Sequence, residues 1–247
     1  MLYSAARTMG YHISAFDGEI GKVRDVLFDD QEWVIRYLVV DLGQWLPRRE
    51  VLLSVAAIGR WEWAQGAIGV SLTKEQIENG PDVSADLPVF RQHEEQLARY
   101  YGWPMYWASS IYGNLEPVSV VPPLPADAKD DVPPPHYDPH LRSVNEVRGY
   151  HIQTADLRFG QLADLLYDAT FAIRLLELHT HRLIPGGQKV VASPAWVHHI
   201  EWNTRRIALI LTSEQLVTLP PVEPGLPANE YDRRLMQWRE EHHVSAA

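Results

Sequence analysis

A pair of histidines, His179 and His181, has a spacing that could hold a metal ion. Two positions apart on a β-strand, both side chains would lie on the same face of that strand. Zinc or copper could use such a pair together with one further ligand. The alternative, which we favour, is that both histidines face solvent on an edge strand or in a loop. On that interpretation the chain needs no metal and no other cofactor.

Four aspartates recur at matching positions in the two halves of the chain: Asp25, Asp29, Asp164 and Asp168. Paired carboxylates can perform acid–base chemistry or bind cations. These aspartates alternate with apolar residues, however, and two equally repeated arginines, Arg36 and Arg174, could be their partners. We therefore expect the aspartates to cap turns, form ion pairs or face water, and we predict no catalytic residue.

A cluster of aromatic side chains is the best candidate for a contact surface, because large aromatic residues dominate the energetics of interfaces. The cluster consists of Tyr100, Tyr101, Trp103, Tyr106 and Trp107. The alternative is that these side chains pack the helix predicted just before them against its own domain. The sequence leaves both possibilities open.

The composition excludes several classes of function. The formal net charge of −10 argues against binding to nucleic acid, which needs clustered Lys and Arg. The chain has no Cys, so thiolate metal sites and Cys nucleophiles are excluded. It also has no nucleophile-elbow or Gly-rich phosphate-loop motif. No apolar stretch has the length of a signal peptide or of a membrane span, so we expect a cytoplasmic protein.

Most of the chain is a repeat, in which residues 10–83 are followed, at a shift of 139 positions, by a second copy at residues 149–222. Gly10-Tyr11-His12-Ile13 matches Gly149-Tyr150-His151-Ile152, and the matches continue to the end of the unit. A repeat of this length indicates two copies of one small domain.

Each copy has the local pattern of a small β-barrel. Asp17-Gly18 between two apolar runs predicts a hairpin with a type I′ turn. Three further runs predict strands: residues 34–40, 50–58 and 67–72. Capping boxes then open a short helix in both copies: Thr73 with Gln76, and Thr212 with Gln215.

The unrepeated parts complete the predicted domain organisation. We expect a first barrel at 1–83, a trailing helix with the aromatic segment at 84–115, a Pro-rich linker at 116–140, a second barrel at 141–222 and a helical tail at 223–247.

Residues 17–54 carry a further pattern: an Asp-Gly-x-Ile-Gly turn, a Val-x-Asp-Val-x-Phe-Asp strand, a Trp-x-Ile-Arg-Tyr-Leu-Val-Val strand and a terminal Val-Leu-Leu strand. In this order they resemble the PRC-barrel domain, and the second copy follows the first. The resemblance implies a mainly β fold of two small barrels that serve as docking modules. The family offers no general catalytic residues. The same domain occurs in the photosynthetic reaction-centre H subunit and in a ribosome-maturation factor, but this chain is more similar to stand-alone tandem PRC-barrel proteins.

We therefore expect a non-enzymatic protein that works by protein–protein contact as a scaffold, with a stress-related role as a further expectation. Because one such barrel buries only a modest core, we expect the copies to pack together, or to exchange strands or helices, and the chain to form a homodimer. Its partners would be itself and an unknown protein. The alternative is a protein that binds a small ligand or a metal through its His-rich second barrel.

Overall fold

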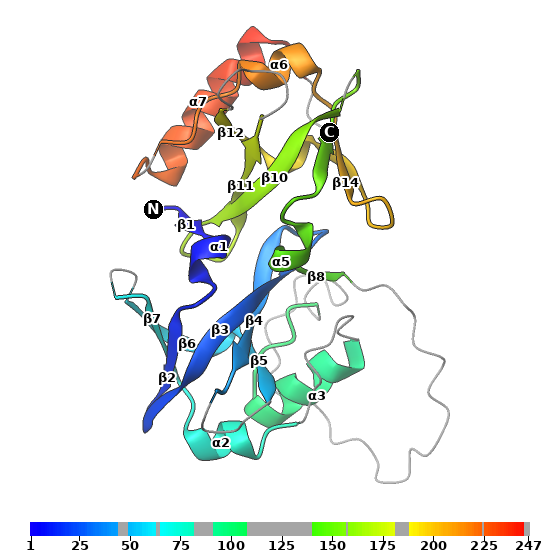
Figure 1. Ribbon diagram of the computed structural model, residues 1–247. Helices are drawn as coiled ribbons and strands as arrows, with labels where there is room; N and C mark the ends of the chain where they lie inside the picture. The colour runs from blue at the N-terminus through cyan, green and yellow to red at the C-terminus, as the bar shows by residue number, and fades with distance from the viewer. Residues whose placement is uncertain are drawn as a thin grey trace, which may run out of the picture.

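The computed structural model describes residues 1–43, 49–62, 65–81, 91–107, 140–156, 158–180, 188–223 and 225–244. Within these residues the chain forms two sheets of seven strands each, six from one copy of the repeat and one from outside the copies. The sheets lie one above the other in Figure 1. The predicted mainly β fold with two barrel-like halves is therefore confirmed. The hydrogen-bonded path of each sheet is open at both ends.

The first sheet is built from the first copy of the repeat. Its strands are β2 (His12–Ala15), β3 (Gly18–Asp29), β4 (Val34–Asp41), β5 (Glu50–Ser54), β6 (Ile58–Glu62) and β7 (Ala67–Val70). They pair in the order β5-β4-β3-β2-β7-β6, in which only β2 and β7 are parallel. A 3-10 turn, η1 (Val55–Ala57), joins β5 to β6, and the helix α2 (Lys74–Glu78) follows β7.

The second sheet repeats this topology. Its strands are β9 (His151–Gln153), β10 (Arg158–Tyr167), β11 (Ile173–His179), β12 (Lys189–Ala192), β13 (Val197–Glu201) and β14 (Arg206–Leu209). They pair in the order β12-β11-β10-β9-β14-β13, again with one parallel pair, β9 and β14. The 3-10 turn η2 (Pro194–Trp196) and the helix α6 (Ser213–Val217) take the places of η1 and α2.

Two sequence predictions need correction at turns. The predicted strand 50–58 is interrupted, because Ser54 accepts a hydrogen bond from the N–H of Ala56 and starts a 3-10 turn. The hairpin at Asp17 forms, but its turn is not type I′: Gly18 has φ +133° and Asp17 has no positive φ. Asp17 instead accepts a hydrogen bond of 2.9 Å from the N–H of Lys74, which ties the turn to α2.

Both predicted capping boxes are present. In α2 the Thr73 side chain accepts from the Gln76 N–H while Gln76 accepts from the Thr73 N–H, and Thr212 and Gln215 do the same in α6. Each helix thereby satisfies two backbone donors at its start.

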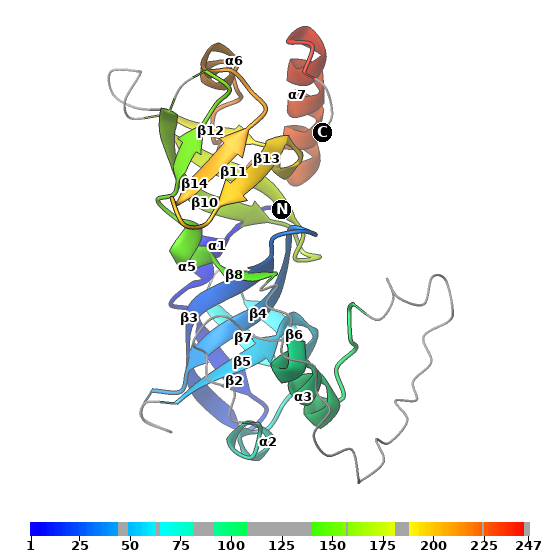
Figure 2. The same ribbon diagram turned by 90° about the vertical axis from the view of Figure 1, so that its right-hand side faces the viewer.

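Two longer helices cover the sheets from outside. α3 (Arg91–Tyr101) lies along the first sheet and α7 (Ala228–Glu241) along the second (Figure 2). Leu97 of α3 packs with Tyr37, Val39 and Leu52 on the outer face of β4 and β5. Tyr231, Leu235 and Trp238 of α7 belong to the main core, which runs through both sheets. Each helix therefore closes an apolar face that the sheet alone would expose.

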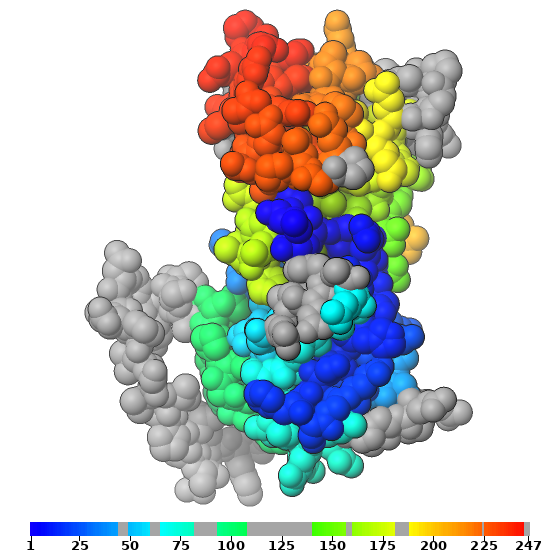
Figure 3. Space-filling view, turned by 90° about the vertical axis from the view of Figure 1, so that its left-hand side faces the viewer, coloured from blue at the N-terminus to red at the C-terminus, as the bar shows by residue number. Residues whose placement is uncertain are grey.

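The two copies exchange the segments that precede them. β1 (Tyr3–Ser4) and α1 (Ala5–Thr8) come before the first copy, yet β1 pairs with β10 of the second sheet. β8 (Leu141–Ser143) and α5 (Val144–Val147) come before the second copy, yet β8 pairs with β3 of the first sheet. Figure 3 shows the N-terminal residues, in dark blue, crossing the waist of the molecule. The expected packing and exchange of strands between the copies thus occurs within one chain.

Candidate functional site

The junction between the copies is held by the repeated aspartate on β10. Asp164 is only 7% exposed, and its Oδ1 accepts from the N–H groups of Ala6 at 2.9 Å and Leu165 at 2.8 Å. Its Oδ2 accepts from the Ser4 hydroxyl. Burial raises the pKa of Asp164, against the lowering effect of these hydrogen bonds. Through these hydrogen bonds the carboxyl group holds α1, which precedes the first copy, against the second sheet.

Asp25 repeats this arrangement on β3. Its carboxylate accepts from the Ser143 hydroxyl and from the Asn145 N–H, at 3.2 Å for the latter. It also accepts from its neighbour Val26 at 2.8 Å. Asp25 and Asp164 therefore accept hydrogen bonds from donors at the starts of α5 and α1, respectively, which is the capping role expected for them.

The remaining repeated aspartates also have structural partners. Asp29 accepts from the N–H groups of Gln31 and Glu32 and lies 3.5 Å from Arg36. Asp168 lies 3.9 Å from Arg174. The predicted Asp–Arg pairs are thus formed in both copies, and none of the four aspartates is left as an obvious acid–base pair.

At the centre of the junction the two hairpins meet. The Ile35 N–H donates to the Phe171 carbonyl at 2.9 Å, and the Ile173 N–H donates to the Trp33 carbonyl at 2.7 Å. Trp33 and Phe171 both have positive φ, 53° and 66°, which is strained for a bulky residue. The same strained turn in both copies shows that the junction is pseudo-symmetric.

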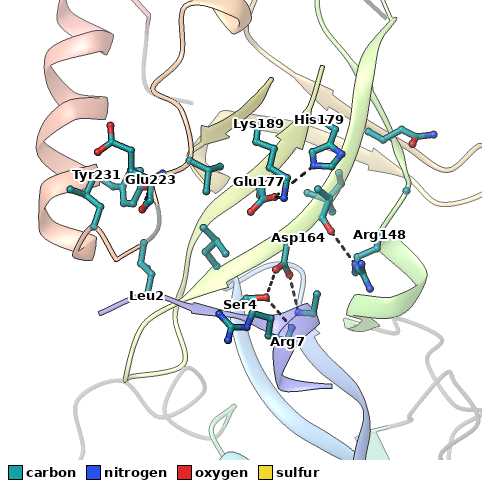
Figure 4. Close-up of a pocket in the computed structure, with 18 of the residues that line it drawn as sticks. Leu2, Ser4, Arg7, Arg148, Asp164, Glu177, His179, Lys189, Glu223 and Tyr231 are labelled. Atoms are coloured by element: carbon teal, nitrogen blue, oxygen red, sulfur yellow. Dashed lines mark hydrogen bonds and ion pairs between the residues drawn. The ribbon is translucent and has the colours of Figure 1, made fainter. Parts of the chain in front are cut away.

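A cavity of about 870 Å³ opens beside this junction, against the second sheet (Figure 4). Both exchanged helices and the segment before α7 contribute to its wall. Its lining includes Leu2, Ser4, Arg7, Arg148, Asp164, Glu177, His179, Lys189, Glu223 and Tyr231. The cavity lies where strands β10, β11 and β12 turn an outer face toward the loop that leads into α7.

The acidic side chains of the cavity wall have partners. Glu177 on β11 is 7% exposed and lies 2.6 Å from the ammonium group of Lys189, with the His179 ring 3.8 Å away. Glu223 forms an ion pair of 2.6 Å with Arg234 of α7. Glu177 and Glu223 thus each have a cationic partner within the protein.

His179, one of the two candidate metal ligands, lines this cavity at the end of β11, whereas His181 lies outside the described residues. Within the described part of the chain no group of three or more His, Cys, Asp or Glu is arranged to hold a metal ion. Of the hypothetical metal pair, His179 is the member that the structure describes.

The aromatic segment lies against its own sheet. Tyr101, Trp103 and Tyr106 are partly buried against the outer face of the first sheet, and the rings of Tyr101 and Trp103 stack at 4.3 Å. Trp107 meets the ring of Tyr106 edge-on at 4.8 Å. Tyr100, by contrast, is 45% exposed. Its ring nonetheless meets the Tyr101 ring edge-on at 4.7 Å, and its hydroxyl donates to the Gln76 carbonyl at 3.2 Å. Each of the five rings thus lies against another ring of the cluster.

Next to the aromatic segment lies a polar cluster that no sequence pattern predicted. Glu94 of α3 is fully buried and accepts from the Tyr106 hydroxyl at 2.7 Å. Its other oxygen lies 3.1 Å from Nε2 of His140, just before β8. The Arg36 guanidinium stands 3.8 Å above the Tyr106 ring. This cluster ties α3 to the exchanged strand β8.

A second hollow, of about 490 Å³, lies on the first sheet over β2, β7 and β6. Its lining is Ser14, Ala15, Phe16, Gly59, Ala67, Ile68, Gly69, Val70 and Ser71. Phe16, at the β2–β3 turn, is 78% exposed. An exposed aromatic side chain therefore stands beside a hollow lined largely by small residues.

Part of the junction could have been found in the sequence. Ser4 and Ser143 are separated by the same shift of 139 positions as the copies, so the repeat extends upstream of Gly10 and Gly149. The cavity and the exposure of Phe16 have no such signal, because both depend on how the segments pack.

In the described residues no helix is long and apolar enough to cross a membrane. The PRC-barrel domain model matches residues 13–65. A protein of Deinococcus radiodurans named "Uncharacterized protein" is 34% identical over 85 residues, which is 34% of this chain. The match spans 30% of that relative's length. The first copy is thus similar to PRC-barrel domains.

Proposed function

We propose that this protein is a non-enzymatic scaffold that works by protein–protein contact and associates with a second copy of itself. The observation that carries the proposal is the exposed Phe16 beside the hollow over β2, β7 and β6. The match to the PRC-barrel domain supports a module of interaction. The repeated carboxyl groups, bound to backbone and hydroxyl donors at the junction, support the absence of catalysis.

The Phe16 surface is self-complementary. Phe16 and the hollow belong to one face, so a two-fold axis can place each Phe16 in the hollow of the partner. A hollow of about 490 Å³ has room for an aromatic ring. An inserted ring would remove its apolar area from water, which stabilises by about 25 cal/mol per Å².

The second copy has lost both halves of this arrangement. Ala155 stands at the position of Phe16, and His198 and Arg206 stand at those of Gly59 and Ala67. The exposed Phe16 and the hollow lined by small residues therefore occur together in the first copy, and the second copy has neither. This joint occurrence favours a second copy of the chain as the occupant.

Light scattering after size exclusion tests the proposal. We expect the wild-type protein to be a dimer at micromolar concentration and Phe16→Ser to shift it toward the monomer by at least tenfold in dissociation constant. Met236→Ser, at a side chain of α7 that is 66% exposed, is the matched control and should leave the dimer intact. A strictly monomeric wild type would refute self-association.

The cavity against the second sheet favours a second candidate function, the binding of a small ligand. Its volume of about 870 Å³ lies in the range of ligand sites, roughly 300–1,000 Å³. His179, a candidate metal ligand, lines it. Calorimetric titration of the tag-free protein with Zn²⁺, with His179→Ala as comparison, tests the metal version of this candidate. Heat that is equal in both proteins, or absent, would dismiss it.

A further inference from the structure

We propose that the cavity beside the junction binds a small anionic ligand, one that carries carboxylate or phosphate groups, between Arg7 and Arg148. The inference rests on the second candidate function, the binding of a small ligand, and names the class of that ligand. Arg7 lies in the last turn of α1 and Arg148 directly follows α5, so the two guanidinium groups come from the two exchanged segments.

The lining carries three carboxylates, Asp164, Glu177 and Glu223, and three cationic side chains, of which, among the described residues, Lys189 is paired with a carboxylate and the two arginines are not. Asp164 is satisfied by three hydrogen bonds, Glu177 by Lys189, and Glu223 by Arg234. Neither Arg7 nor Arg148 forms an ion pair with a carboxylate of the described residues. Arg148 donates through Nε to the Ala163 carbonyl at 3.0 Å, which orients the guanidinium and leaves its other donors. In Figure 4 the two arginines lie on either side of Asp164.

The pseudo-symmetry of the junction supplies an internal comparison. At the repeat's shift of 139 positions, Arg7 corresponds to Glu146 and Arg148 corresponds to Met9. The cavity side of the junction thus carries two cations at these positions, in a chain whose net charge is −10. The equivalent positions on the other side carry a carboxylate, Glu146, and a thioether, Met9.

Arginine is suited to such a ligand. Its planar fork of donors matches carboxylate and phosphate oxygens in pairs, and charge-assisted hydrogen bonds of this kind are about twice as strong as neutral ones. Two guanidinium groups on one cavity fit a ligand with more than one anionic group. Such a ligand would bridge α1 and α5, and it would therefore stabilise the junction as well as occupy the cavity.

Calorimetry and thermal unfolding of the full chain, with citrate and pyrophosphate as anionic probes and glucose as an uncharged probe, test the inference. We expect one of the anions to bind, to raise the melting temperature, and to bind more weakly as salt is added. Arg7→Gln combined with Arg148→Gln should weaken that binding by at least tenfold. Glu146→Gln, at the equivalent position on the opposite face, is the matched control and should leave the affinity within twofold.

Three results would overturn the inference. Anion binding that is unchanged in the double arginine variant would place the anion elsewhere. Binding of glucose but of neither anion would refute the anionic class while keeping the proposal of a small-ligand site. Binding of none of the probes at millimolar concentration would count against both. Circular dichroism of each variant separates loss of binding from loss of fold.

Discussion

Thr8 and Tyr167, which are 159 positions apart, share a buried hydrogen bond of 2.7 Å between their hydroxyl groups across the junction. The equivalent positions in the other half are Val147 and Phe28, both apolar and both buried. Two polar residues on one side thus correspond to two apolar residues on the other. In each half of the junction, the residue on the exchanged helix and the residue on the sheet that receives it are therefore of the same kind, polar in one half and apolar in the other.

This matching predicts the outcome of a double-mutant cycle. Thr8→Val alone should remove the hydroxyl that the buried Tyr167 hydroxyl contacts and cost about 1–3 kcal/mol of unfolding free energy. Thr8→Val with Tyr167→Phe should recover most of that loss, because this pair is the one present in the other half. Urea unfolding of the single and double variants measures the coupling. Additive losses would show that the hydroxyl pair is not an energetic unit.

The raised pKa of Asp164 predicts a pH dependence of stability with a definite sign. A carboxyl group whose pKa is higher in the folded protein contributes stability that is present below its unfolded pKa of about 4 and is lost as the pH rises through the folded pKa. Asp164→Asn keeps an oxygen for the Ala6 and Leu165 N–H groups but does not ionise. The variant should therefore gain stability relative to the wild type as the pH rises above about 4.

Urea unfolding of both proteins from pH 4 to pH 8 checks this prediction. Other groups titrate in the same range, so the informative quantity is the difference between the two unfolding free energies at each pH. A difference that stays constant over the range would mean that Asp164 has the same pKa in both states.

Cutting the chain between the copies should not separate them. After cleavage at a protease site inserted in the predicted Pro-rich linker, 116–140, the halves should remain joined through β1 with β10 and β8 with β3. We expect the fragments to co-elute in native size exclusion and to part only in denaturant. Asp25→Ala with Asp164→Ala, which removes both carboxyl groups, should weaken the association of the cut halves. Separation of the wild-type halves at micromolar concentration would argue against a stable junction.

Two repeated glycines predict a matched pair of destabilising substitutions. A Cβ at Gly21 would lie 2.0 Å from the Asp41 carbonyl oxygen, and a Cβ at Gly160 would lie 2.0 Å from that of His179. Gly21→Ala or Gly160→Ala should force the strands apart and cost about 1–3 kcal/mol or more. Gly59→Ala is the control, since the nearest atom to its Cβ is 4.0 Å away. Equal melting temperatures for all three would contradict the close approach.

Much of each sheet could be predicted from the sequence because the signals are local. The β-branched run at 34–40 forms β4, and the capping boxes at Thr73 and Thr212 form where their spacing places them. The type I′ turn at Asp17 was predicted wrongly, because the carboxylate binds the start of α2 and tertiary contacts override the local preference. The trailing helices were also visible in their apolar spacing.

The exchange of segments could be anticipated only as one of several possibilities. Ser4 could clasp Asp25 of its own copy as well as Asp164 of the other, since the two aspartates have similar sequence surroundings. The candidate functional site could be predicted even less from the sequence. Glu94, His140 and Tyr106 come together through the packing of α3 on the exchanged strand. Arg7 and Arg148 line the same cavity only because α1 packs on the sheet of the other copy.

The exchange also sets the order of events during synthesis on the ribosome. Asp30 forms an ion pair of 3.0 Å with Arg142 of β8, which lies 112 positions later in the chain. The first sheet therefore cannot add its last strand until the segment before the second copy has been synthesised. At about 5–20 residues per second this delay lasts roughly 6–22 seconds. During that time the edge of β3 that will receive β8 is open. The nascent first half is therefore the stage at which a chaperone, or another copy of the chain, has access to this edge.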